Sequence, residues 1–176
     1  MSIVKFRNKV NYKTYLYVSV LGNSLKLNIK YTNDSTIQLN KTNTQIDLFL
    51  PKKYKSIDNI NVINLAIQKL YAQIAEIEIE DSLEIARHIL RFAPEDYSIK
   101  RMDNCFYKCS KNKIIINPDI VKYNKEIINT TILEAFCKIK YKPNSVAYKN
   151  LLNSALNKYE IYKRSTSSQF RTLKIS

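Results

Sequence analysis

The sequence predicts an α+β fold: an N-terminal antiparallel β meander, a long helix, a small sheet and a closing pair of helices. Apolar and polar residues alternate in three segments of the first 50 residues, which is the pattern of half-buried strands. A helical apolar periodicity then begins near residue 59. At 176 residues the chain suits one domain with a sizeable core.

Turn-forming residues separate the strands of the predicted meander. Asn23 and the pair Asn33-Asp34 mark its turns, because Asn and Asp tolerate the backbone conformations of tight turns. Pro51 ends the third strand. The predicted strands are Tyr15–Val20, Ser24–Tyr31 and Thr44–Leu50.

Two helices are predicted in the middle of the chain. The long one covers residues 59–79 and is capped by Ser56 or Asp58. A shorter helix follows Ser82 and stops before Pro94, since proline cannot continue a helix.

The second half predicts three short strands followed by two helices. We expect strands over 97–102, 105–110 and 113–117, a helix over 125–140, and a last helix that ends near Tyr159. Asn144 or Ser145 caps this last helix. The sequence therefore divides into one domain over residues 1–160, β-rich over 1–55 and helical over 56–160, and a tail over 161–176.

Composition excludes several classes of function. A single glycine in 176 residues rules out glycine-rich phosphate loops and dinucleotide-binding fingerprints. The single histidine, His88, is the one possible imidazole base, and no nucleophile elbow accompanies it, so it is interpreted as a half-buried helix residue. No run of 18 apolar residues and no signal-type N-terminus is present, which predicts a cytoplasmic protein.

Three cysteines do not make a disulfide framework. Cys105, Cys109 and Cys137 are an odd number, and free or buried thiols are the expected state. A zinc site formed by these cysteines with His88 is the alternative, although a Cys-x3-Cys spacing is uncommon for zinc.

One block of the second half carries a family resemblance. Residues 128–148 read INTTILEAFCKIKYKPNSVAY. They align without a gap on I-D-Y-V-V-V-H-E-L-C-H-L-x-x-x-N-H-S-x-x-F, the pattern that ends the YgjP-like zinc metallopeptidases. Upstream, Phe106-Tyr107-Lys108-Cys109-Ser110 resembles the family's W-G-S-C-S, and a strand ending at Asn117 follows it. The resemblance implies a YgjP-like domain over residues 1–160 with a zincin-like helix pair.

The resemblance also implies that the zinc chemistry is missing. In such helices two histidines at i and i+4 bind Zn²⁺, and the glutamate beside the first acts as general base on the metal-bound water. The positions of His, Glu, His and His are here Glu134, Ala135, Lys138 and Asn144. A protonated lysine has no lone pair, and alanine takes no proton. We therefore expect no metal, no catalytic residue, and an i,i+4 ion pair between Glu134 and Lys138.

Net charge points to a polyanionic partner. The chain carries +14, and residues 97–176 hold 16 basic and 5 acidic side chains against 13 and 10 in residues 1–96. Such an excess favours RNA or DNA as a partner, although lysine-rich composition alone is the alternative. Basic residues interleaved with aromatic ones in the tail suit nucleic acid, or the tail is a solvated terminus. The candidate contacts are Lys138, Lys140, Lys142, Lys149, Lys163, Arg164, Arg171 and Lys174.

Three functions stay open from the sequence. The first is a pseudoenzyme that uses a peptidase fold as a scaffold for nucleic acid or a ribonucleoprotein. The second is a residual zinc-dependent hydrolase with metal held by Glu134, Asn144 and a cysteine, for which the motif supplies no base. The third is a protein-binding adaptor that uses the former substrate cleft, where a peptide would add to a sheet edge.

Overall fold

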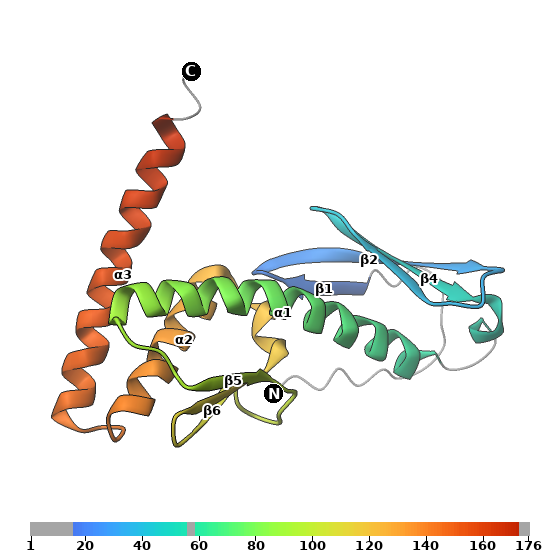
Figure 1. The fold of residues 1–176 in the computed structure, drawn as a ribbon. Helices are drawn as coiled ribbons and strands as arrows, with labels where there is room; N and C mark the ends of the chain where they lie inside the picture. The colour runs from blue at the N-terminus through green and yellow to red at the C-terminus, as the bar shows by residue number, and fades with distance from the viewer. Residues whose placement is uncertain (1–15, 56–58, 173–176) are drawn as a thin grey trace. The chain divides into compact units, whose positions relative to one another are not determined.

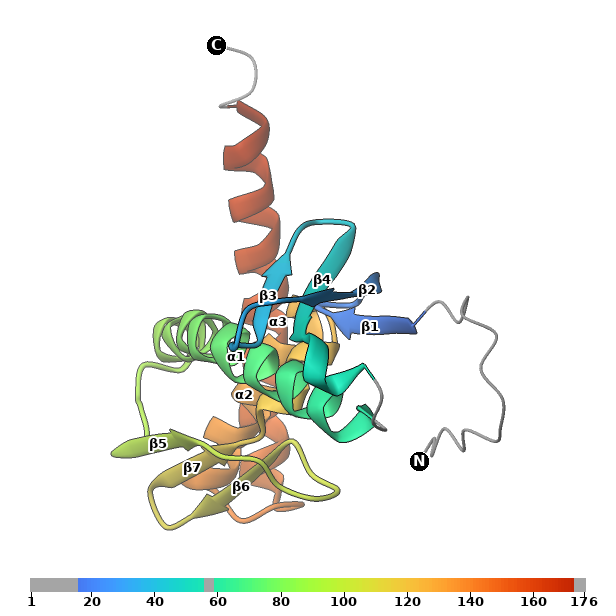
Figure 2. The same ribbon diagram turned by 90° about the vertical axis from the view of Figure 1, so that its right-hand side faces the viewer.

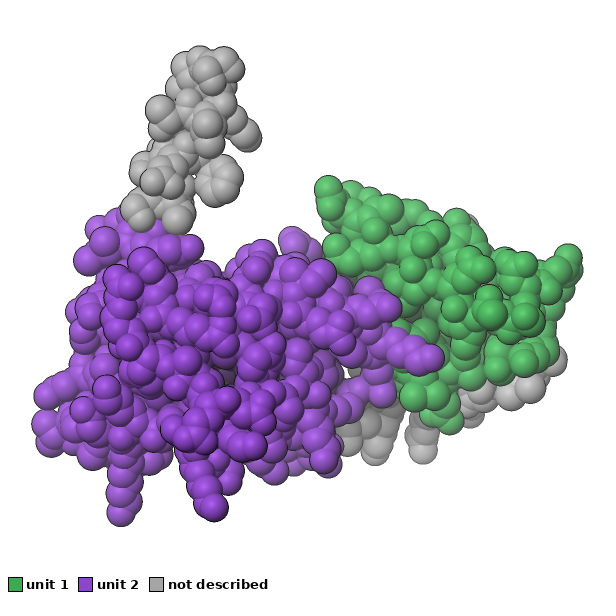
Figure 3. All heavy atoms as spheres, in the orientation of Figure 1, with its two compact units in different colours: residues 1–19, 24–66 green, residues 20–23, 67–176 purple. Residues whose placement is uncertain are grey.

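The computed structural model describes residues 16–55 and 59–172, with side chains up to residue 164. These residues form two compact units (Figure 3). Unit 1 holds 16–19, 24–55 and 59–66, and unit 2 holds 20–23 and 67–172. Helix α1 (Ile60–Leu90) contributes its start to unit 1 and the rest to unit 2. The predicted caps Ser56 and Asp58 lie outside the described residues.

The predicted α+β class is confirmed, but the N-terminal sheet is not a simple meander. Its strands are β1 (Leu16–Val20), β2 (Asn23–Thr32), β3 (Gln38–Lys41) and β4 (Gln45–Pro51), in the order β1-β2-β4-β3 (Figure 1). Strand β4 pairs parallel to β2 and antiparallel to β3. The short polar strand β3 was not predicted from the sequence, and it lies at the edge of the sheet.

Burial explains this strand order. Ile46, Leu48 and Leu50 of β4 are fully buried, so β4 takes a central place between two neighbours. Leu25 and Leu27 of β2 lie on the same buried side of the sheet. Strand β3 is largely exposed and tolerates an edge, where one row of its backbone groups faces solvent.

Unit 2 is built around two long helices, a shorter one and a small sheet. The strands β5 (Asp96–Ile99), β6 (Tyr107–Ser110) and β7 (Lys113–Ile116) form a sheet with β7 in the centre (Figure 2). A 3-10 turn, η2 (Pro118–Lys122), leads to α2 (Lys125–Lys140), and α3 (Val146–Thr172) follows. Helix α2 packs against α3, β6 and η2, so it is the central element of the unit.

Helix α1 is continuous where the sequence predicts two helices. Ser82 does not cap a second helix, because its hydroxyl donates to the carbonyl of Glu78 within the same helix at 2.8 Å. The buried stripe runs through this point, with Ala75, Ile79, Leu83 and Ala86 at helical spacing. No helix among residues 16–55 and 59–172 is long and apolar enough to cross a membrane.

The last helix is also longer than predicted. It continues past Tyr159 to Thr172, so much of the predicted tail is the end of α3. Of the two predicted caps, Ser145 is the one used, since its hydroxyl accepts the Tyr148 N–H at 3.1 Å. Asn144 instead adopts a left-handed conformation with φ of 68° in the preceding loop.

The single glycine of the chain lies where two elements of unit 2 meet. Gly22, with φ of 79°, is in the turn between β1 and β2, and its N–H donates to the carbonyl of Lys122. The neighbouring Leu21 N–H donates to the carbonyl of Val121 at 2.7 Å. A Cβ on Gly22 would lie 2.9 Å from the Cβ of Asn124, the residue that caps α2. The absence of a side chain at Gly22 therefore leaves the space that Asn124, the capping residue of α2, occupies.

We predict that Gly22→Ala destabilises the protein by at least about 1 kcal/mol, because it adds both backbone strain at positive φ and a steric clash. Denaturant unfolding followed by circular dichroism measures the change. Asn23→Ala, one residue further on at an exposed position, is the control and should change stability by less than about 0.5 kcal/mol. Equal effects of the two substitutions would contradict the role given to Gly22.

Candidate functional site

Helix α2 positions the residues that the sequence singles out. Asn124 caps the helix by accepting the Ile127 N–H at 3.0 Å. Ile128, Ile132 and Phe136 are fully buried and fix the orientation of the helix about its axis. Glu134 and Lys138 then lie on the partly exposed side of the helix, one turn apart.

Glu134 and Lys138 form the predicted ion pair. The Lys138 Nζ lies 2.9 Å from Glu134 Oε1, and the two side chains are 30% and 38% exposed, respectively. This burial sets the pair apart from an ordinary surface pair, for which attraction is largely screened by water. The two residues are four apart on α2, the spacing at which two histidines on one helix can bind a zinc ion.

Two tyrosines from other elements complete the cluster. The Tyr148 hydroxyl, from the first turn of α3, donates to Glu134 Oε1 at 3.3 Å. The Lys138 Nζ lies 4.7 Å from the ring centroid of Tyr107 on β6, which is cation–π distance. We call Glu134, Lys138, Tyr107 and Tyr148 the Glu134 cluster. It joins α2, α3 and β6 through one carboxylate and one ammonium group.

The cluster favours a charged glutamate and neutral phenols. Burial raises the pKa of Glu134, but the hydrogen bond and charge of Lys138, together with hydrogen bonding from the tyrosines, outweigh burial, so this pKa lies below its ordinary value. Burial, with the charge of Glu134, raises the pKa of Tyr148 to about 12. The same two causes raise the pKa of Tyr107. Both tyrosines therefore stay protonated at neutral pH.

The cysteines beside the cluster are not activated nucleophiles. Cys109 on β6 donates through its Sγ to the Ala135 carbonyl at 3.5 Å, and burial raises its pKa. Burial, followed by the charge of Glu134, raises the pKa of Cys137 to about 11. A thiol is reactive as its thiolate, so these shifts indicate packing rather than catalysis. His88, which the sequence places half-buried, is exposed on α1 beside Tyr162.

The donors present do not suit a zinc ion. Lys138 has no lone pair when protonated, and its ammonium group adds positive charge beside Glu134. The buried Ala135 offers no base, and Asn144 is exposed in the loop before α3. Among the described residues no group of three or more His, Cys, Asp or Glu side chains is arranged to hold a metal. Cys105, Cys109, Cys137 and His88, the alternative zinc site considered from the sequence, form no such group in the described structure.

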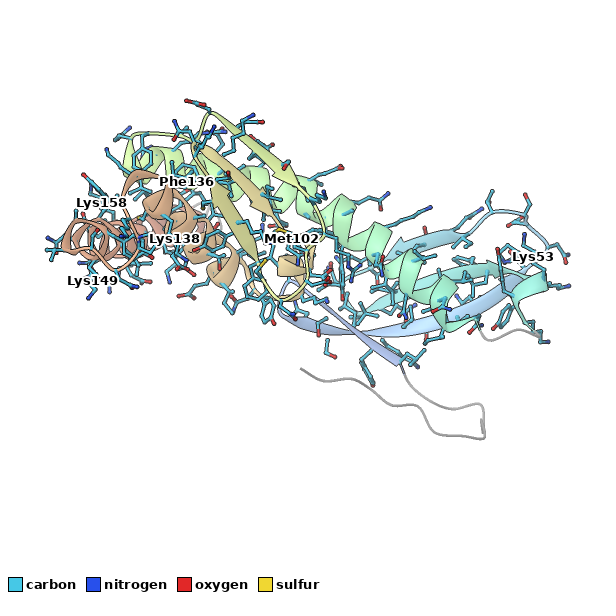
Figure 4. The ribbon with its side chains drawn as sticks, turned by 90° about the horizontal axis from the view of Figure 1, so that it is seen from below. Lys53, Met102, Phe136, Lys138, Lys149 and Lys158 are labelled. Carbon is cyan, nitrogen blue, oxygen red and sulfur yellow. The ribbon has the colours of Figure 1, made fainter. Side chains whose placement is uncertain are left out.

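The predicted basic residues lie in two parts of the chain, around the end of α2 and near the end of α3. Lys138, Lys140, Lys142 and Lys149 lie on α2, on the loop after it and at the start of α3, and Figure 4 labels Lys138 and Lys149 there. Lys163 instead is tied to Glu126 and Glu160, at 2.9 and 2.8 Å, and these carboxylates raise its pKa. Arg164 is exposed on α3. The side chain of Arg171 and the whole of Lys174 lie outside the described residues.

Comparison with protein families identifies the chain. The model of the YgjP-like, metallopeptidase domain matches residues 3–169. The chain belongs to the YgjP-like family. Comparison with curated proteins and with solved structures gave no match in either case.

In this YgjP-like chain, four of the positions that differ from the pattern quoted in the sequence analysis meet at one place. Glu134 and Lys138 stand where that pattern has two histidines, Tyr107 stands where it has a glycine, and Tyr148 stands where it ends on a phenylalanine. All four form the Glu134 cluster. The sequence analysis predicts the ion pair but misses the two tyrosines. Their departure from the pattern was a usable signal, whereas their convergence required the tertiary structure.

We predict that Glu134 and Lys138 are coupled by about 1 kcal/mol, above the roughly 0.3–0.5 kcal/mol of an exposed i,i+4 pair. Removal of Lys138 alone leaves a partly buried carboxylate unpaired, so Lys138→Met should cost more than the double substitution with Glu134→Gln. Denaturant unfolding of the four proteins of this cycle measures the coupling.

The exposed pair Lys113–Asp96, at 3.2 Å, is the control for that cycle. Its coupling should stay below about 0.5 kcal/mol. A coupling near zero for Glu134 and Lys138 would show that their proximity does not stabilise the fold.

We predict a pH dependence with a definite sign. The pKa of Glu134 is lowered in the folded protein, so its contribution is present above the ordinary glutamate pKa of about 4.3 and is lost as pH falls through the folded value. The free energy of unfolding of wild type minus that of Glu134→Gln should therefore shrink between pH 7 and pH 3. Urea unfolding at several pH values tests this, and a constant difference would contradict it.

Proposed function

We propose that this YgjP-like chain is a pseudoenzyme that binds nucleic acid, alone or within a ribonucleoprotein, in the cytoplasm. The observation that carries the proposal is the charge around the former catalytic helix. Between Glu134 and Glu160 the sequence has no acidic residue and five basic ones, Lys138, Lys140, Lys142, Lys149 and Lys158. A field of one sign attracts phosphate backbones, which release condensed counterions on binding.

The exposed lysines of this region are available for contacts. Lys142 and Lys149 are exposed and have no ion-pair partner among the described residues. Lys111, in the turn between β6 and β7, is also exposed. Lys138 is different, because its ammonium group is held by Glu134. We therefore assign Lys138 to the Glu134 cluster, and we propose that the exposed lysines contact the ligand.

Loss of peptidase activity is the other half of the proposal. A metallopeptidase needs a Lewis acid and a base near the metal-bound water, and Ala135 and Lys138 offer neither. Loss of general-base help is by itself typically worth about 10²–10⁴-fold in rate. The Glu134 cluster supports the view that the former site now serves the stability of unit 2.

We predict no chelator-sensitive peptide cleavage by the purified protein. A broad peptide library, digested with and without added zinc and analysed by mass spectrometry, tests this. A family member with an intact His-Glu-x-x-His helix serves as the positive control. Cleavage that a chelator abolishes and zinc restores would refute the pseudoenzyme proposal.

We predict salt-dependent binding of nucleic acid that depends on Lys142 and Lys149. Fluorescence anisotropy with a short RNA and a short duplex DNA should show affinity falling steeply with salt. Replacing both lysines by glutamate should weaken binding and flatten the slope of log affinity against log salt by about 1.5, since each phosphate contact contributes roughly 0.7–0.9.

The same charge change in unit 1 is the control. Lys52 and Lys55 are exposed on and just after the 3-10 turn η1 (Lys52–Tyr54), and their substitution by glutamate should alter the slope far less. Should neither nucleic acid bind more tightly than about 10⁻⁴ M at low salt, the proposal fails. The basic excess would then reflect composition, and the adaptor function would be favoured.

A further inference from the structure

One tyrosine of unit 2 differs from the others in its surroundings. Unit 2 contains eight tyrosines, and seven of them contact another side chain through their ring or hydroxyl. The contacts pair Tyr71 with Lys122, Tyr97 with Glu80, Tyr107 with Lys138, Tyr123 with Phe106, Tyr148 with Glu134, Tyr159 with Asn129, and Tyr162 with His88. Tyr141 has no such partner among the described residues and is 38% exposed.

The backbone holds Tyr141 in place although its ring is free. Its N–H donates to the carbonyl of Cys137 at 3.0 Å, which closes the last turn of α2. The loop after it is short and hydrogen-bonded, since the Ser145 N–H donates to the carbonyl of Lys142 at 3.2 Å. Because the backbone at Tyr141 is already ordered, binding of a ligand has only the side chain to order, which lowers the entropic cost of binding.

Lysines are frequent in the segment that carries this ring. Lys140 and Lys142 flank it in the sequence, and Lys149 lies on the first turns of α3. Lys140 rests over the ring of Phe92 at 4.6 Å, and this contact with an uncharged ring leaves its positive charge unneutralised. The surface around Tyr141 therefore combines an exposed aromatic face with positive charge.

We propose that Tyr141 stacks on an unpaired base and that Lys142 and Lys149 contact the adjoining phosphates, so that the ligand of this surface is single-stranded nucleic acid. The inference rests on the proposed function and specifies its ligand class. Aromatic rings combined with a positively charged surface are the physical means by which proteins bind single strands. In a duplex the base faces are covered by their neighbours, so the Tyr141 ring gains nothing there.

The chemistry of the site also predicts weak sequence preference. Stacking uses the π face that every base has, and lysine contacts to phosphate carry no sequence information. The ring of Tyr141 should therefore accept any of the four bases. Preference for single strands over duplex, rather than preference for a sequence, is the property that this surface confers.

Fluorescence anisotropy of the full-length protein with a 12-nucleotide RNA and with the matching duplex tests the proposal. Tyr141→Ala should weaken binding of the single strand by about 5- to 100-fold, the loss expected for one stacked base, and should leave duplex binding nearly unchanged. Tyr141→Phe keeps the aromatic face and should keep the affinity. Tyr123→Ala removes a ring of similar exposure, 41%, that already contacts Phe106, and should have little effect.

A second variant reports the stacking directly. The chain has no tryptophan, so Tyr141→Trp creates a single tryptophan reporter. Its emission should be quenched when the single strand binds and should change little when the duplex binds.

The outcomes separate the two proposals. If the wild-type protein binds neither nucleic acid, the proposed function and the stacking role both fall. If it binds nucleic acid but Tyr141→Ala binds the single strand as well as wild type does, the stacking role is wrong and the proposed function stands. Binding of the single strand without quenching of the tryptophan in Tyr141→Trp would also overturn the stacking role.

Discussion

The organisation of this site depends on the interactions of one group, the carboxylate of Glu134. It receives the ammonium group of Lys138 at 2.9 Å and the hydroxyl of Tyr148 at 3.3 Å, and Lys138 in turn covers the ring of Tyr107. This pair of charges thereby connects α2, α3 and β6. Metal ligands from different elements connect those elements in a comparable way, and here a salt bridge with two aromatic rings makes such a connection.

Two surfaces of unit 2 consequently carry different roles in this account. The Glu134 cluster uses its charges internally, so Lys138 contributes little to the field that an anionic ligand meets. The loop after α2 and the start of α3 keep Lys142 and Lys149 exposed, with Tyr141 between α2 and the loop.

Local patterns in the sequence predicted most of the fold, and long-range pairing accounts for the differences. Helix α2 and the three short strands β5, β6 and β7 lie close to their predicted positions, because apolar periodicity and turn residues define them locally. The parallel pairing of β2 with β4 was missed, since it depends on the polar strand β3, whose four residues carry little apolar signal. The unbroken α1 was missed because Ser82 satisfies its hydroxyl within the helix. At the site, the i,i+4 spacing predicted the ion pair, whereas Tyr107 and Tyr148 lie 27 and 14 residues from Glu134.

The zinc content of the purified protein tests the central claim most directly. Elemental analysis and native mass spectrometry after purification without chelators would measure zinc per chain, and a family member with the intact His-Glu-x-x-His helix, purified in parallel, shows that the procedure retains the metal. The account predicts no stoichiometric zinc, because the ammonium group of Lys138 and the methyl group of Ala135 stand where a ligand and a base are needed. One zinc per chain that is lost on Glu134→Ala or Cys109→Ala would contradict it.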